Sequence, residues 1–79
     1  MDPVACIKII NDTDEWMNTR EDAVHDLAEW LHKGGAVPID GGNISDQACE
    51  DLREFTGDII PSIRVCIAYG DYSGLNYSF

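Results

Sequence analysis

The sequence predicts an α+β domain in which a small, mainly antiparallel sheet carries two acidic helices on one face. The first observation is a pair of apolar runs of strand length, residues 4–10 and 62–69. The second is a helical spacing of apolar side chains over residues 20–33 and 46–56. The third is a short alternating segment at 75–79. The expected order is therefore strand, helix, helix, strand, strand.

The first half of the chain is expected to form a strand and then a helix. Residues 4–10 are rich in β-branched side chains, and the polar residues 11–14 end this run. Thr19 is the expected N-cap of the helix over residues 20–33, and Gly34 begins its stop. The apolar stripe that should face the sheet consists of Val24, Leu27, Ala28 and Leu31.

The second half adds an edge strand, a helix and a hairpin. Residues 36–39 suit an edge strand, because Pro38 lacks the N–H group that a central strand requires. Ser45 is the expected N-cap of the helix over residues 46–56, and Gly57 is its end. Alternation then predicts two strands with their larger apolar side chains on one face: Ile63, Val65, Ile67 and Tyr69, followed by Leu75, Tyr77 and Phe79.

The composition indicates a single folded domain over residues 1–79. The chain has 79 residues, of which 44% are hydrophobic, so it is too apolar for a disordered segment. Its three cysteines form no CxxC pair, which argues against a disulfide framework or a zinc site and suits a reducing compartment. The sequence has no signal-peptide pattern and no run of about 18 apolar residues. We therefore expect a cytoplasmic protein.

No catalytic, metal or cofactor motif is matched well. His25 and His32 are not at i, i+4 spacing, and neither belongs to an HExxH motif. The segment 12–15 begins like a calcium loop, but Met17 and Ala23 occupy the positions that require Gly and Glu. No nucleophile has a base beside it. The expectation is a protein that is not an enzyme and that binds neither metal nor cofactor.

The negative charge is concentrated in the two predicted helices and in the loop before the first. The chain has 15 acidic and 5 basic residues, a net charge of −10. Residues 12–29 contain seven acids and one base, which gives −6, and residues 46–58 contain five acids and one base, which gives −4. Like charges four residues apart destabilise a helix by about 0.2–0.5 kcal/mol per pair. A sequence selected only for stability would have interleaved charges of both signs, so this placement supports a binding surface beside the alternative of a merely solvated acidic face.

Nine of these acids are the candidate partner-binding residues. Carboxylates four residues apart on a helix are separated by about 6 Å, a spacing comparable to that of phosphates along a DNA strand. Two such helices side by side would resemble duplex DNA, and a basic nucleic-acid-binding protein surface would accept them. The charge argues against nucleic acid itself and against anionic membranes as direct partners. The candidates are Asp12, Asp14, Glu15, Asp22, Asp26, Glu29, Asp46, Glu50 and Glu54.

The two tryptophans flank the apolar stripe of the first predicted helix. Trp16 precedes this helix, and we expect it to cover the core. Trp30 lies at the margin of the stripe, where a half-exposed side chain is expected. Exposed aromatic side chains often anchor protein interfaces, but packing against the core is the favoured interpretation for both.

By its size, its charge and its pattern of acidic helices over a small sheet, the chain resembles the small acidic phage-encoded anti-CRISPR proteins of the DNA-mimic type. The resemblance implies a monomeric, stoichiometric inhibitor that blocks DNA binding by a type I CRISPR effector, through contact with a subunit of its Cascade complex in the bacterial host cell. Two alternatives use the same acids. One is an acidic immunity protein or antitoxin that neutralises a basic nuclease, and the other is a non-enzymatic interaction domain whose acidic face is merely solvated.

Overall fold

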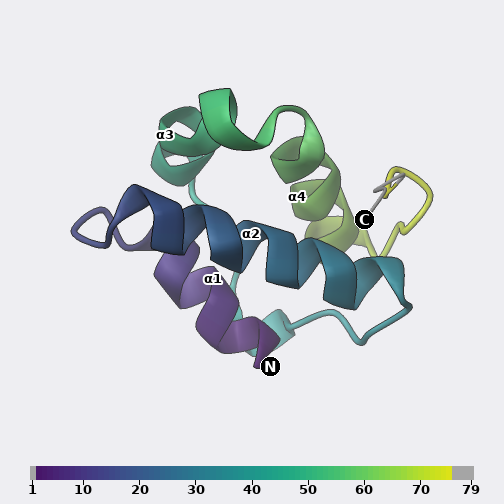
Figure 1. The fold of residues 1–79 in the computed structure, drawn as a ribbon. Helices are drawn as coiled ribbons and strands as arrows, with labels where there is room; N and C mark the ends of the chain where they lie inside the picture. The colour runs from purple at the N-terminus through teal and green to yellow at the C-terminus, as the bar shows by residue number, and fades with distance from the viewer. Residues whose placement is uncertain (1, 76–79) are drawn as a thin grey trace.

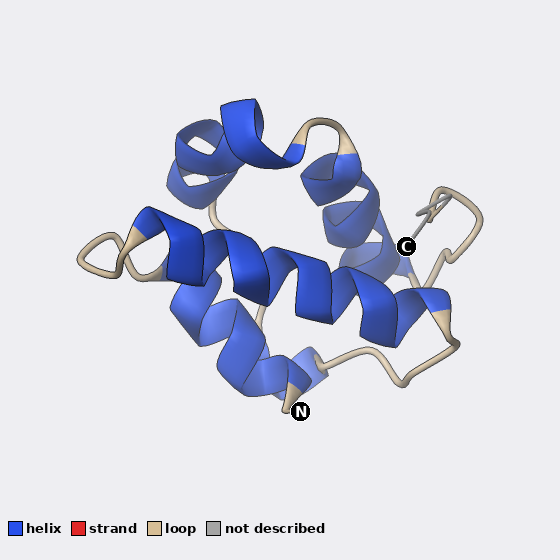
Figure 2. Ribbon diagram, viewed as in Figure 1, coloured by secondary structure: helices blue, strands red, loops and turns tan. Residues whose placement is uncertain are grey.

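A computed structural model describes residues 2–75, which form four α-helices and one 3₁₀ helix (Figure 1). The helices are α1 (Pro3–Asn11), α2 (Met17–His32), η1 (Ile39–Gly41), α3 (Asp46–Thr56) and α4 (Ile59–Tyr69). Figure 2 shows only helices and connecting loops across the described range, with no β-strand. The predicted α+β fold, with its antiparallel sheet, is therefore wrong.

Residues 4–10, predicted as the first strand, belong to helix α1. The carboxylate of Asp2 caps this helix by accepting a hydrogen bond from the Val4 N–H at 3.0 Å. Pro3 stands in the first turn, where its missing N–H costs no helical bond. β-Branched side chains have low helix propensity, but the cap and the burial of one helical face outweigh it. The buried side chains of that face are Cys6, Ile7 and Ile10.

Residues 62–69, predicted as the clearest strand, lie in helix α4. Pro61 falls in the first turn of this helix, where the N–H groups have no intrahelical partner. Gly70 ends the helix in the left-handed conformation, with a φ of 69°. The alternating apolar set is divided between core and solvent, because Val65 and Tyr69 are exposed. The buried residues follow a helical spacing instead: Ile60, Ile63 and Cys66.

The other two predicted strands are not found in the described residues. Residues 36–38 form a loop that leads into η1, so the edge strand at 36–39 is absent. Leu75 is buried, but it lies in no strand. The remainder of the predicted closing strand, with Tyr77 and Phe79, lies outside the described residues.

The two predicted helices are confirmed, one of them with a shifted start. The Ser45 hydroxyl caps α3 by accepting the Ala48 N–H at 3.1 Å, and Gly57 ends the helix with a φ of 60°. Helix α2 begins at Met17, three residues earlier than predicted, so that Thr19 lies within it and is not its N-cap.

One hydrophobic core joins all four α-helices. Helix α2 crosses the front of the molecule in Figure 1, with α1 below it and α3 and α4 above. Helix α1 packs most extensively against α2. The apolar stripe predicted for α2 is buried in this core, and the other elements supply the side chains that surround it. These are Cys6, Ile7, Ile10, Ile44, Ala48, Leu52, Ile60, Ile63, Cys66 and Leu75.

A buried arginine joins three of the helices. Arg20 of α2 is only 1% exposed. Its Nε donates a hydrogen bond to the Ile10 carbonyl in α1 at 2.9 Å. Its Nη1 donates to the Asp51 carboxylate of α3 at 3.3 Å. A guanidinium has N–H donors in a fixed plane, so one side chain can bond both neighbouring helices at the same time.

We expect Arg20→Ala to lower the free energy of unfolding by about 2–4 kcal/mol, because it removes both hydrogen bonds and leaves a cavity. Urea denaturation followed by circular dichroism measures this loss. Arg53→Ala, which truncates an exposed arginine on α3, is the matched control and should change the same free energy by less than about 0.5 kcal/mol. Equal losses in the two variants would contradict a role for Arg20 in joining the helices.

Candidate functional site

The first three candidate acids lie in the loop between α1 and α2. Asp12 and Asp14 are exposed, and Glu15 is half-buried. The Asp12 carboxylate accepts the Asp14 N–H at 2.9 Å, and the Glu15 carboxylate accepts the Trp16 N–H at 3.0 Å. These local bonds shape the loop. Each of them engages one oxygen of the Asp12 or Glu15 carboxylate, so the loop holds these two negative charges in place.

The next three candidates lie along the outer side of α2, opposite its buried side chains. Asp22 and Asp26 are exposed, and Glu29 is half-buried. Their spacing of four and three residues places them on one stripe of the helix. Glu29 is paired within the chain, because the Lys33 Nζ lies 2.6 Å from its Oε1.

The last three candidates, Asp46, Glu50 and Glu54, are exposed on the side of α3 opposite its buried residues. The Asp46 Oδ1 lies 2.6 Å from the Nη2 of Arg64 in α4. This hydrogen bond raises the pKa of the Arg64 guanidinium above its ordinary value. The stripe on α3 therefore starts with a paired carboxylate and continues with two that have no ion pair among the described residues.

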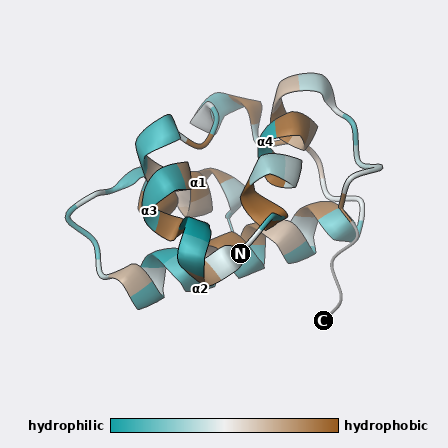
Figure 3. Cartoon of the chain, turned by 90° about the horizontal axis from the view of Figure 1, so that it is seen from above, coloured by the Kyte–Doolittle hydropathy of each residue, from teal (hydrophilic) through white to brown (hydrophobic). Residues whose placement is uncertain are grey.

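The two helical stripes do not form one flat face. Each stripe lies opposite the buried side of its own helix, and Figures 1 and 3 show α3 above and behind α2. The acids of the two helices therefore point outward from the shared core in different directions. The prediction that both helices pack on one face of a sheet is wrong, because the described residues form no sheet.

Hydrogen bonds of Asn11 join the end of α1 to the segment that begins α3. The Asn11 side chain donates to the Asn43 carbonyl at 3.0 Å and accepts the Ser45 N–H at 2.8 Å. This contact places the end of α1, which leads into the acidic loop, beside the first turn of α3. The nine candidates thus extend from the loop onto the outer sides of both helices, and we call this set of acids the acidic band.

Most of the acidic band has no internal counter-charge. Within residues 2–75, seven of the nine candidates have no ion pair, the exceptions being Glu29 and Asp46. Asp51, which also lies on α3 but was not a candidate, is the acid that pairs with the buried Arg20. Figure 3 shows α3 largely in the hydrophilic colour, whereas α4 has more of the hydrophobic colour. The acids that hold the fold together are thus separate from most of the acids of the band.

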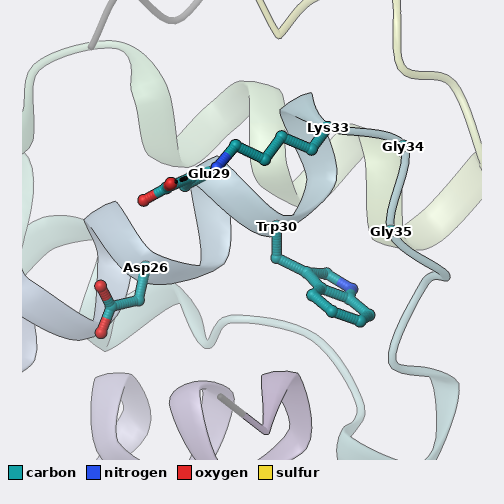
Figure 4. A pocket seen from close by; sticks show the side chains of 6 residues that line it. All are labelled: Asp26, Glu29, Trp30, Lys33, Gly34 and Gly35. Carbon is teal, nitrogen blue, oxygen red and sulfur yellow. Dashed lines mark hydrogen bonds and ion pairs between the residues drawn. The ribbon is translucent and has the colours of Figure 1, made fainter.

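A pocket of about 460 Å³ lies beside the C-terminal half of α2 (Figure 4). Trp30 and Asp26 project from the same side of the helix, and the Glu29–Lys33 ion pair lies at the rim. The Trp30 Nε1–H donates to the Ala36 carbonyl at 2.9 Å, which fixes the orientation of the indole. Gly34 and Gly35 complete the lining. This pocket combines an aromatic wall with carboxylates of the acidic band.

The two tryptophans have different environments. Trp16 is 78% exposed, so the expectation that it covers the core is wrong. The physical reason is the earlier start of α2, which places Trp16 at the N-cap position at the end of the loop. Trp30 is half-buried and packs against the core, as predicted for a residue at the margin of the stripe. No pattern in the sequence indicates that Trp30 lines a pocket, because its lining depends on the path of residues 34–36.

The three cysteines are free and differ in burial. Cys6 and Cys66 are buried in the core, and desolvation raises the pKa of both thiols above the ordinary value. Cys49 is partly exposed and lines a groove between α3 and α4. Within the described part of the chain, no group of three or more His, Cys, Asp or Glu side chains is arranged to hold a metal ion.

Comparison with protein-family models, curated proteins and solved structures found nothing that this chain matches. None of the helices in residues 2–75 has the length and apolar character that crossing a membrane requires.

The burial of the thiols predicts their order of alkylation. In the native protein we expect iodoacetamide to modify Cys49 at least about tenfold faster than Cys6 or Cys66, because only accessible thiolates react readily. Mass spectrometry of tryptic peptides over time measures the three rates. Cys49→Ser should remove the fast phase, and in urea the three thiols should react at similar rates. Fast native modification of Cys66 would contradict the packing of α4.

Proposed function

We propose that this chain is a stoichiometric, non-enzymatic inhibitor whose acidic band occupies the basic nucleic-acid-binding surface of another protein. The target we propose is the DNA-binding surface of a type I CRISPR effector complex, in the cytoplasm of a bacterial host cell. The observation that carries the proposal is the excess of carboxylates without ion pairs on one band of a small fold.

The charge density of the band supports a nucleic-acid-like role. Asp22 to Glu29 spans about 10 Å of α2 at 1.5 Å per residue. Duplex DNA carries about six charges over the same length. The three acids of the α2 stripe therefore give about half the density of duplex DNA, and a groove that also contacts the loop or α3 would meet more.

The energetics of the helices support a role in binding as well. In α3, Glu50 lies four residues from both Asp46 and Glu54, and each such like-charge pair destabilises the helix by about 0.2–0.5 kcal/mol. Cations of a partner surface would remove this repulsion on binding. Opposite charge also accelerates the encounter of two proteins, which suits an inhibitor that competes with DNA.

Reversal of charge in the band tests the proposal. The variant Asp22→Lys/Glu50→Lys/Glu54→Lys changes the net charge from −10 to −4. We expect it to raise the concentration needed to inhibit DNA binding by a purified type I CRISPR surveillance complex by about tenfold or more, because like charges would then face each other. The assay is an electrophoretic mobility shift with a fluorescent target duplex.

The matched control for this variant is Asp40→Lys/Asp58→Lys/Asp71→Lys, which makes the same change in net charge at exposed positions outside the band. It should inhibit nearly as well as the parent, and circular dichroism should show that both variants fold. A folded band variant that inhibits as strongly as the parent would overturn the proposal. Inhibition of a basic nuclease without inhibition of the CRISPR complex would indicate the immunity-protein alternative, and inhibition of neither would exclude the proposed role.

Salt provides an independent prediction. Because the contacts we propose are between exposed charges, raising the salt from about 0.05 M to 0.2 M should weaken the affinity for the CRISPR complex by about tenfold or more. Titrations of the labelled protein at several salt concentrations give this dependence. An affinity that is the same at both concentrations would mean that the acids are not the binding residues.

A further inference from the structure

The pocket beside Trp30 has the features of a site for one cationic side chain. Two hydrogen bonds connect Trp30, which provides the aromatic wall of the pocket, to the loop that follows α2. The Trp30 Nε1–H donates to the Ala36 carbonyl at 2.9 Å, and the backbone N–H of Gly35 donates to the Trp30 carbonyl at 2.8 Å. The loop that follows α2 therefore folds back onto the same residue that provides the wall.

Gly35 lies directly against the indole. A Cβ added to this glycine would overlap the Cε2 and Nε1 atoms of the Trp30 indole. Any side chain at position 35 must therefore displace the ring, so the glycine is needed for the present position of the indole. The loop thus packs against the indole, and Trp30 lines the pocket together with Gly34 and Gly35.

The negative charge of the pocket comes from Asp26. It lies one turn before Trp30 on the same side of α2, as Figure 4 shows. Residues four apart on a helix have Cβ atoms about 6 Å from each other. Asp26 is exposed and has no ion pair within residues 2–75, whereas the Glu29 carboxylate is joined to Lys33. The ammonium of Lys33 is thus already neutralised at the rim, and Asp26 is the carboxylate left for a ligand.

We propose that this pocket accepts an arginine side chain of the partner protein, with the guanidinium stacked on the Trp30 indole and hydrogen-bonded to the Asp26 carboxylate. The proposal rests on the proposed function, and it identifies the class of residue that the acidic band would meet. A planar guanidinium can stack on an aromatic ring and donate N–H groups in its own plane. The ammonium of lysine is a compact, strongly hydrated charge that matches this arrangement less well.

The test is a titration of the isolated ¹⁵N-labelled protein with N-acetyl-arginine amide, followed by the indole N–H signals in NMR. The signal of Trp30 should shift saturably, and that of the exposed Trp16 serves as an internal reference. N-acetyl-citrulline amide, which has the same shape without the charge, should bind at least about fivefold more weakly. N-acetyl-lysine amide should also bind more weakly than the arginine compound.

Three variants make the test specific. Asp26→Asn should weaken arginine-amide binding by about fivefold or more, whereas Asp22→Asn makes the same charge change outside the pocket and should leave it nearly unchanged. Gly35→Ala should abolish the shift by displacing the indole, with Asp26 and Trp30 both retained. Equal binding of citrulline amide or lysine amide, equal effects of the two aspartate variants, or a shift of Trp16 alone would each overturn the proposal.

The pocket and the inhibitor proposal can fail separately. The titration requires no CRISPR complex, and the charge-reversal variant leaves Asp26 and Trp30 unchanged. Loss of inhibition in that variant, together with no arginine binding at Trp30, would retain the acidic band and reject the pocket. Arginine binding together with undiminished inhibition by the variant would retain the pocket and reject the role of the acidic band in inhibition instead.

Discussion

The buried guanidinium of Arg20 is the contact on which the arrangement of the acidic surface depends. It bonds the Ile10 carbonyl of α1 and the Asp51 carboxylate of α3, while its own backbone belongs to α2. Burial of a charge is costly unless it is paired and hydrogen-bonded, so these partners must stay in place. Because α1 leads into the acidic loop and α3 carries the last three candidate acids, this side chain ties together the elements that carry the two parts of the band.

The sequence predicted α3 well because the signals for this helix are local. Ser45 and Gly57 stand at its two ends, and both act as predicted. The core stripe of α2 was likewise visible in the spacing of its apolar residues. The outer positions of the acids on both helices follow from the same periodicity, which explains why the candidate residues lie on the surface.

Helices α1 and α4 were not predicted, because each is a short apolar segment that carries a single charge, Lys8 or Arg64. Periodicity alone cannot distinguish a buried strand of this length from a buried helix. The Asp2–Pro3 start of α1 and the Gly70 end of α4 were the available signals in favour of helices. Tertiary contacts such as the Arg20–Asp51 ion pair leave no trace in a local sequence pattern. Only the structure therefore shows that Asp51 holds the fold together, whereas most of the candidate acids have no ion pair and lie on the surface.

The core residues and the acidic residues are distributed differently over the four α-helices. The apolar helices α1 and α4 and the buried stripe of α2 supply most of the core, and α2 and α3 carry most of the acids on their outer sides. Repulsion between the carboxylates therefore acts mainly at the surface, where water and salt screen it. A small fold can tolerate a net charge of −10 in this arrangement, provided that its few internal ion pairs remain intact.

The loop that follows α2 is held by two side chains, one from the end of α2 and one from the segment after α4. Trp30 bonds the Ala36 carbonyl, and the hydroxyl of Tyr72 donates to the Gly35 carbonyl at 2.9 Å. The backbone on this side of the pocket is thus ordered when the protein folds, before any ligand arrives. Association then need not include the entropy loss of ordering that loop, which is the advantage of a preorganised site. The segment after α4, far from the pocket in sequence, contributes to recognition by holding its wall in place.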